Sequence, residues 1–325
     1  MSLNSNSGSL ESAPLLEAEA VHEQPQRLPK TWATWLVEIA LFIGVSLLAI
    51  AYLFPFKADY SSGVQMVPSV SFNSLRVITA GPGETSVVVL EGEGNMAKVA
   101  WDVSHPSITV EPVLISSDSS LQITISFGVP FYSGSHTTVL YVTLPSPLTA
   151  LNMTGSKIHV IYQGPLITDS VSIKSSGGSI RFINPLTLNN FIVSTKWGQI
   201  ETSNITATQS VQIETGEGSI LTSVHSYKRF QAKCRICAIT AAIYSPVVDS
   251  ITDLSSDYGI TAVVQGFTGK YYVETIPKTD QITIIGADAD QESLFPVIGW
   301  VGGRNSQGSF KAVTGAYPVV LVFSK

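Results

Sequence analysis

The sequence predicts an all-β protein: a β-solenoid ectodomain with an additional N-terminal β region, preceded by a single transmembrane helix. Three observations support this fold class. Charged residues make up only 13 % of the 325 residues, while Ser, Thr, Gly and β-branched residues are abundant, a composition more typical of strands than of helical bundles. One long apolar run lies near the N-terminus. Short strand-like segments recur further along the chain at intervals of about 20 residues, as in repeat proteins.

The charge and the cysteine count exclude several classes of protein. The net charge is −6 and no stripe of Lys or Arg is present, so we expect no nucleic-acid partner. The chain contains only two cysteines, too few for a fold that depends on disulfides. No motif for a cofactor occurs, and we predict none.

Residues 1–30 predict a disordered cytosolic tail, because they are polar and show no apolar periodicity. Within the tail, "ESAPLL" places Glu11 four residues before the pair Leu15 and Leu16. This pattern resembles the acidic dileucine signal that sorting adaptors bind. A chance match in a random tail is the alternative, and the sequence leaves both open.

Residues 31–56 predict a transmembrane helix that acts as a signal anchor and has the lipid bilayer as its partner. The run "WATWLVEIALFIGVSLLAIAYLFPF" contains Glu38 as its only charge. At about 1.5 Å per residue it is long enough for a hydrocarbon layer of about 30 Å. A cleaved signal peptide would have a shorter apolar region and would not follow thirty polar residues.

Charges and glycosylation motifs predict the orientation of this helix. Arg27 and Lys30 precede the apolar run and Lys57 follows it, a weak bias towards a cytosolic N-terminus. The sequons at Asn152 and Asn204 both follow the run, and their glycosylation requires a lumenal or extracellular C-terminal part. We therefore expect a vacuolar or endosomal membrane, or the cell surface.

The remainder of the chain divides into four segments. Residues 57–67 predict a linker, and residues 68–165 an N-terminal β region with strands such as "TSVVVLEGEG" and "SLQITISFGV". Residues 166–275 carry the repeats, and residues 276–325 predict a C-terminal β cap.

Each repeat contributes two short strands, whose first inward residue we call an anchor. Anchors of the first strand are spaced by 20, 20, 19 and 21 residues, and anchors of the second strand repeat these spacings. Such a period predicts stacked rungs whose inward side chains are buried by the neighbouring rungs. Gly178, Gly198 and Gly218 stand two residues before a second anchor and suit a corner with positive φ. The predicted core consists of the first anchors Val171, Phe191, Val211, Phe230 and Ile251 and the second anchors Ile180, Ile200, Ile220, Ile239 and Ile260.

These repeats, introduced by "LYVTLPSPLTALNMTGSKIHV", resemble the adhesin domains of unknown function. In those domains an "LP…L" strand leads into V-x-I and G-x-I units that stack as a β-helix. The resemblance covers about residues 135–275. The chain departs from the pattern where Cys237 and Tyr258 replace the corner glycine and where Asp253 takes an inward-type position. The resemblance implies a non-catalytic, exported β domain.

Two groups of residues could carry chemistry. Cys234 and Cys237 have the spacing of a redox or metal half-site, but no second pair of ligands accompanies them. A local disulfide that braces a corner is the expected state, with two buried thiols as the alternative. Asp249, Asp253 and Asp257 lie within one repeat, and paired carboxylates are what a glycosidase needs. Without the Arg, His and aromatic residues of a substrate groove nearby, we expect solvated turn aspartates.

The sequence thus predicts a non-catalytic single-pass membrane glycoprotein that presents the solenoid for binding or scaffolding, with a protein or a glycan as the ligand. Two alternatives stay open. One is a carbohydrate-active β-helix enzyme, which carboxylates clustered in one groove would favour. The other is a lumenal sensor similar to late-embryogenesis-abundant proteins of the vacuole or plasma membrane, which an apolar cavity within residues 68–165 would favour.

Overall fold

The computed structural model describes residues 62–128, 136–276, 281–289, 296–315 and 317–324. In these residues the chain forms 22 strands and one short 3-10 helix, Ser69–Ser71. None of the helices in this part of the chain has the length and apolar character needed to cross a membrane. The predicted tail and the predicted transmembrane helix, residues 31–56, lie outside the described residues, as does most of the linker.

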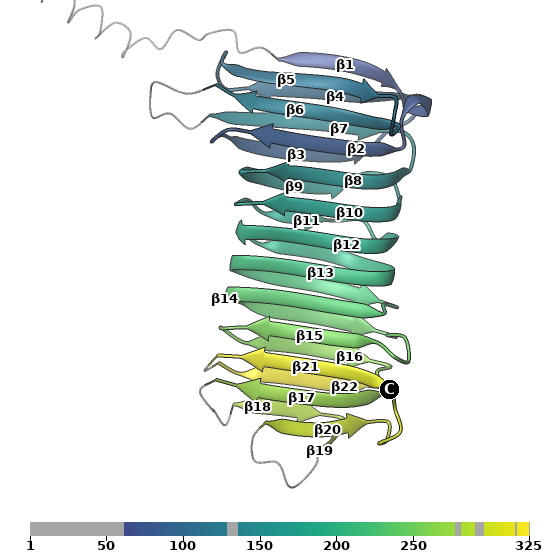
Figure 1. Cartoon of the computed structure of the whole chain (residues 1–325), viewed down its shortest axis with the longest axis vertical. Helices are drawn as coiled ribbons and strands as arrows, with labels where there is room; N and C mark the ends of the chain where they lie inside the picture. Colours follow the sequence, from purple (N-terminus) through teal and green to yellow (C-terminus); the bar gives the residue numbers. More distant parts are fainter. Residues whose placement is uncertain (1–61, 129–135, 277–280, 290–295, 316, 325) are drawn as a thin grey trace, which may run out of the picture. The chain divides into compact units, whose positions relative to one another are not determined.

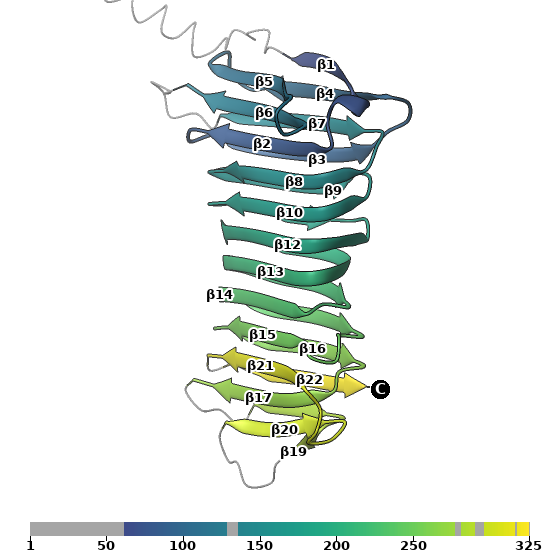
Figure 2. The ribbon, with the colours of Figure 1, turned by 45° about the vertical axis from the view of Figure 1, so that its right-hand side comes forward.

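The strands stack as rungs of a two-sided solenoid (Figures 1 and 2). Each regular rung places one strand in a first sheet and the next strand in a second sheet, and strands of successive rungs pair in parallel. In spatial order, the first sheet contains β5 (Ile108–Ile115), β6 (Ser120–Phe127), β2 (Ser74–Ala80), β8 (Leu148–Gly155), β10 (Ile167–Ser175), β12 (Leu186–Trp197), parts of β13 (Ile200–His225) and β14 (Arg229–Tyr244), β15 (Ile251–Ser256), β21 (Gly308–Thr314), β17 (Gly269–Thr275), β20 (Val297–Val301) and β19 (Asp288–Ala289).

The second sheet closes the other side of the stack. It contains, in the same direction, β1 (Gly63–Pro68), β4 (Met96–Val103), β7 (Thr137–Leu144), β3 (Glu84–Glu91), β9 (Lys157–Gln163), β11 (Ile180–Phe182), the remaining parts of β13 and β14, β16 (Ile260–Gln265), β22 (Val319–Ser324) and β18 (Ile282–Ile285). Because β13 and β14 run through corners from one sheet into the other, the two sheets are continuous. The stack is all-β and solenoid-like, in agreement with the predicted fold class.

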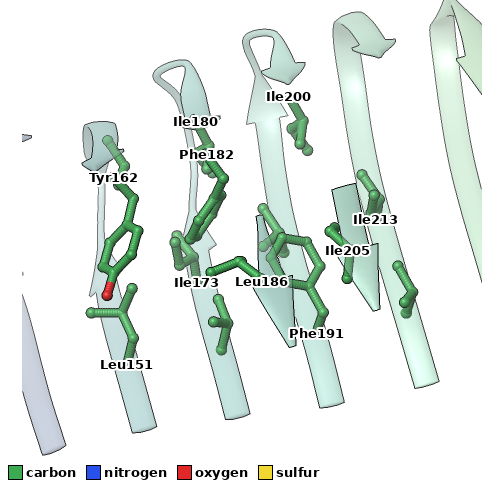
Figure 3. Packing of buried hydrophobic residues seen from close by; sticks show 14 of the residues in the cluster. Leu151, Tyr162, Ile173, Ile180, Phe182, Leu186, Phe191, Ile200, Ile205 and Ile213 are labelled. Atoms are coloured by element: carbon green, nitrogen blue, oxygen red, sulfur yellow. The ribbon is translucent and has the colours of Figure 1, made fainter. Parts of the chain in front are cut away.

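The core lies between the two sheets and is filled by the inward side chains of every rung (Figure 3). Nine of the ten predicted anchors are at most 1 % exposed. Val171 pairs with Phe191, and Ile220 pairs with Ile239. Pairing of equivalent positions lets identical side-chain faces stack, which explains why one rung alone could not bury them.

The prediction for Ile251 was wrong. Its side chain is 48 % exposed, and the inward position is taken by Thr252, which pairs with Phe230. The physical reason lies in the preceding turn: the buried Tyr227 shares a hydrogen bond of 2.5 Å with the Thr252 hydroxyl. An inward hydroxyl needs such a partner, and Tyr227 supplies it from inside the stack.

This shift by one position also corrects Asp253. Because side chains alternate along a strand, the inward Thr252 and Leu254 place Asp253 on the outer surface, where it accepts a hydrogen bond of 3.2 Å from Gln231. The rung is therefore spaced by 22 residues at Thr252 and by 21 at Ile260, its second anchor.

The rungs at both ends do not follow the order of the sequence. Near the N-terminal end β2 lies between β6 and β8, and near the C-terminal end β21 lies between β15 and β17. Antiparallel strands then cover the last rungs, β1, β4 and β5 at one end and β19 and β20 at the other. The predicted boundaries at residues 165/166 and 275/276 thus fall inside one continuous stack.

Candidate functional site at a corner of the stack

The glycines at the corners serve the backbone first. Gly178, Gly198 and Gly218 have φ of +103°, +136° and +128°. A Cβ atom on Gly198 would lie 2.3 Å from the carbonyl oxygen of Gly178, and one on Gly218 would lie 2.4 Å from that of Gly198. Successive corners therefore touch through backbone alone, which only glycine permits.

Inside these corners runs a ladder of hydroxyl groups that the sequence reasoning missed. Ser175, Thr195 and Thr215 are buried and stand four residues after a first anchor. Thr215 Oγ1 lies 3.0 Å from the carbonyl oxygens of both Gly198 and Glu217. The hydroxyls thus satisfy carbonyls that the sharp turn leaves without a strand partner. The spacing of 20 residues between Ser and Thr was the available signal.

The fourth corner replaces this arrangement by sulfur. Cys234 takes the ladder position opposite Thr215, and Cys237 takes the glycine position opposite Gly218. The two are joined by a disulfide, with 5.6 Å between their Cα atoms. The expected disulfide is therefore present, and it closes the corner covalently.

A notch of about 470 Å³ opens on the outside of three corners, at the edge where β8 and β10 end (Figure 1). Its floor is the bare backbone of Gly177, Gly178 and Gly198. One wall is the indole of Trp197, a residue 49 % exposed. The remaining lining residues are Pro82, Ser156, Lys157, His159, Ser176 and Ser179. Such a volume lies in the range of small-ligand pockets, about 300–1,000 Å³.

An ion-pair cluster fixes the charged side of the notch. Glu84 pairs with Lys157, and Glu84 Oε1 lies 3.0 Å from His159 Nε2. The Ser179 backbone N–H donates to His159 Nδ1 over 3.2 Å, so the ring proton of a neutral His159 sits on Nε2, facing Glu84. The hydrogen bond from Lys157 holds the pKa of the Glu84 carboxyl below its ordinary value. Glu84 is therefore ionised at neutral pH and offsets the lysine charge.

The three aspartates singled out in the sequence do not form a carboxylate pair. Asp249 precedes β15 and Asp257 follows it, while Asp253 lies in the middle of that strand. At about 3.3 Å per residue, Asp253 is about 13 Å along the chain from each of the others. A glycosidase needs about 5–9.5 Å. Over the described ranges, no group of three or more His, Cys, Asp or Glu side chains could hold a metal ion.

The two sequons lie on strands. Asn152, on β8 in the first sheet, is half-buried between Ser172 and Arg76 of the neighbouring strands. Asn204, on β13, is exposed, and its side-chain oxygen accepts a hydrogen bond of 2.8 Å from Ser223. Asn204 is thus the more accessible acceptor. The sorting signal Glu11, Leu15 and Leu16 lies outside the described residues.

The second sheet also carries an apolar column near the N-terminal end of the stack. Val64, Tyr141 and Ile161 are 62 %, 45 % and 42 % exposed, and they lie in register with Ala100 and Val88 between them. Among the described residues no segment covers this column. The structure therefore gives no occupant for it.

Comparison with known proteins places part of the chain in a known context. Residues 104–233 match the sequence profile of the Toastrack family DUF4097, so about two fifths of the chain is similar to that family. No curated protein matches the chain.

Three solved structures are similar over 82 % of this chain. They are a "putative adhesin" from Bacteroides fragilis NCTC 9343 (13 % identity, TM-score 0.39, 97 % of its own chain), a "putative adhesin" from Parabacteroides distasonis ATCC 8503 (10 %, 0.37, 98 %) and a "putative cell adhesion protein" from Clostridium sporogenes ATCC 15579 (9 %, 0.25, 100 %). Likeness at this level transfers no function to the chain.

Proposed function

We propose that this chain is a single-pass membrane glycoprotein whose β-solenoid ectodomain binds a ligand without catalysis. The observation that carries the binding role is the notch at Gly177, Gly178 and Trp197, because it combines a concave floor, an exposed indole and polar side chains. The repeated rungs hold these elements rigidly, since each corner rests on the next.

The membrane anchor is supported by the sequence and by the start of the stack. The apolar run of residues 32–56 ends six residues before Ser62, where the described chain begins, and β1 starts at Gly63. An anchor followed at once by a stack of β rungs suits a protein that presents its ectodomain to a lumen or to the exterior.

The two other functions have less support. The enzyme would require the carboxylates of Asp249, Asp253 and Asp257 to face one groove, whereas they are spread along β15 and its ends. The sensor would require an apolar cavity in residues 68–165. The hollow beside Ser69, Phe72 and residues 144–148 has no room for a water molecule. Binding at the corner notch is the better-supported function.

The topology is tested in sealed membrane vesicles that contain the full chain. Treatment with peptide-N-glycosidase should increase its mobility in a gel, and Asn204→Gln should remove most of the shift because Asn204 is the exposed sequon. Asn152→Gln is the matched control at the half-buried sequon. External protease should cleave the tail and spare the ectodomain. A protected tail would contradict the orientation.

The sorting signal is tested separately. Leu15→Ala with Leu16→Ala removes the apolar half of the proposed adaptor contact and leaves the anchor intact. The full chain should then move from an endosomal or vacuolar membrane to the cell surface. An unchanged location would leave "ESAPLL" as a chance match.

A further inference from the structure

We infer that the corner notch binds one neutral pyranose unit of a glycan, stacked on Trp197 and held at its edge by serine hydroxyls, Lys157 and His159. This inference rests on the proposed binding role of the ectodomain and names the chemistry of its ligand. A pyranose has flat C–H faces and an edge of hydroxyl groups. Its faces suit the negative face of an aromatic ring, and its edge suits groups that donate and accept hydrogen bonds.

The apolar part of the notch is shaped for a flat ring. An ideal Cβ on Gly177 would lie 3.6 Å from Lys157 Cγ and 3.7 Å from Trp197 Cε3. The glycine backbone therefore forms a floor between the lysine stem and the indole. Lys196 Nζ lies 4.7 Å from the centroid of the Trp197 ring, and about half of the residue remains open to a ligand.

The polar part of the notch offers hydroxyls that can adapt to a sugar. Ser176 and Ser179 are exposed, and Ser156 Oγ donates to the Gly81 carbonyl over 2.7 Å, which leaves its lone pairs free to accept. Lys157 has two further N–H donors beyond its bond to Glu84. These groups surround the glycine floor on the side away from Trp197.

Two other ligand classes fit the notch less well. A peptide strand would need free backbone groups, but the Gly177 N–H donates to Ser175 Oγ, the Ser179 N–H donates to His159, and the Gly198 N–H donates to the Glu217 carbonyl. An anion such as a phosphate would have to displace Glu84, whose carboxylate already engages Lys157 and His159. A neutral, hydroxyl-rich ring requires neither change.

The test measures binding of the detergent-solubilised full chain to an array of neutral and acidic glycans. The wild-type chain should bind neutral glycans. Trp197→Ala should weaken that binding at least about tenfold, and Trp197→Tyr, which keeps an aromatic face, should restore most of it. Gly177→Val, which fills the floor, should also weaken binding at least about tenfold. Tyr141→Ala removes an equally exposed aromatic residue elsewhere on the second sheet and should leave binding unchanged.

Thermal unfolding of each variant keeps the test decisive. A Trp197→Ala chain that unfolds like the wild type and still binds glycans equally would overturn the site. Binding of acidic glycans alone would overturn the neutral ligand. Absence of any glycan binding would overturn the inference while the topology experiments still decide whether the chain is an anchored, exported protein.

Discussion

Four successive corners of the stack can be compared residue by residue. At three of them a hydroxyl, that of Ser175, Thr195 or Thr215, bonds to the carbonyl two residues further on, and a glycine with positive φ follows. At the fourth, Cys234 and Cys237 occupy the equivalent positions and a disulfide spans the turn. The same change of direction is thus stabilised by hydrogen bonds in one region and by a covalent bond in the next.

The difference teaches what each corner must supply. Each one has to hold the chain in a tight turn and leave room for the corner above and below it. Hydroxyl and glycine meet these needs separately, and the disulfide meets the first of them. Ser256, one rung later, again donates to the corner below it, at the Cys237 carbonyl, so the ladder resumes. The comparison predicts different sensitivities at the two kinds of corner.

Gly198→Ala should have the largest effect, a loss of about 2–4 kcal/mol in the free energy of unfolding. The new Cβ would lie 2.3 Å from the Gly178 carbonyl oxygen at φ +136°, which combines backbone strain with overlap. Urea unfolding of the full chain measures the loss. Gly177→Ala is the matched control, because its Cβ would meet neighbours no closer than 3.6 Å and should change stability by less than about 0.5 kcal/mol. Equal losses at both glycines would contradict the role of corner contact.

Removal of the disulfide should cost less, about 2 kcal/mol. Loop-closure entropy gives about this value for a loop of four residues, and urea unfolding with and without reductant measures it. The pair Cys234→Thr with Cys237→Gly imitates the neighbouring corners and should recover part of the loss. The pair Cys234→Ala with Cys237→Ala should not. If both pairs are equally unstable, hydroxyl and glycine are not equivalents of the disulfide.

The sequence predicted the regular rungs well and the irregular positions poorly, for physical reasons. Alternating apolar residues at a period of about 20 are a local signal, and they located Ile180, Ile200 and Ile220 in the core. The inward choice between Ile251 and Thr252 depends on Tyr227, a partner 25 residues away. The insertion of β21 between β15 and β17 depends on pairings across long gaps in the sequence, which no local pattern encodes.

The candidate site was hidden for a related reason. Its residues come from turns about 20 residues apart, at Lys157, Gly177 and Trp197, and from Pro82 in a turn much earlier in the chain. The repeat places the last three turns side by side and so contained part of the signal. The position of Pro82 and Glu84 follows only from the pairing of β3 with β9. A comparison of outward residues at the corners would have found Trp197 but not Glu84.

Thr215→Val tests the hydrogen-bonded corner with a smaller effect, about 1 kcal/mol. Valine keeps the shape and removes the hydroxyl that lies 3.0 Å from two carbonyl oxygens. The Glu217 carbonyl also accepts from the Gly198 N–H, so the loss should stay near that of a single hydrogen bond. Thr240→Val, at an exposed position of the second sheet, is the control and should be nearly neutral. A neutral Thr215→Val would remove the hydroxyl ladder as a stabilising feature.

The smallest effect is expected where the rung after the disulfide corner changes register. Ile251 lies outside the stack and is 48 % exposed, while Leu254, three residues later, is fully buried. Ile251→Lys should therefore change the free energy of unfolding by less than about 0.5 kcal/mol, whereas Leu254→Ala should cost about 2–5 kcal/mol through lost burial and a residual cavity. The contrast is informative because a slip of one residue exchanges the two faces of a strand. With Ile251 inside, as the uniform period predicts, lysine at this position would bury an unpaired charge and unfold the rung. Urea unfolding of the two variants thus separates a stack with one constant period from one in which Tyr227 and Thr252 reset the register after the disulfide.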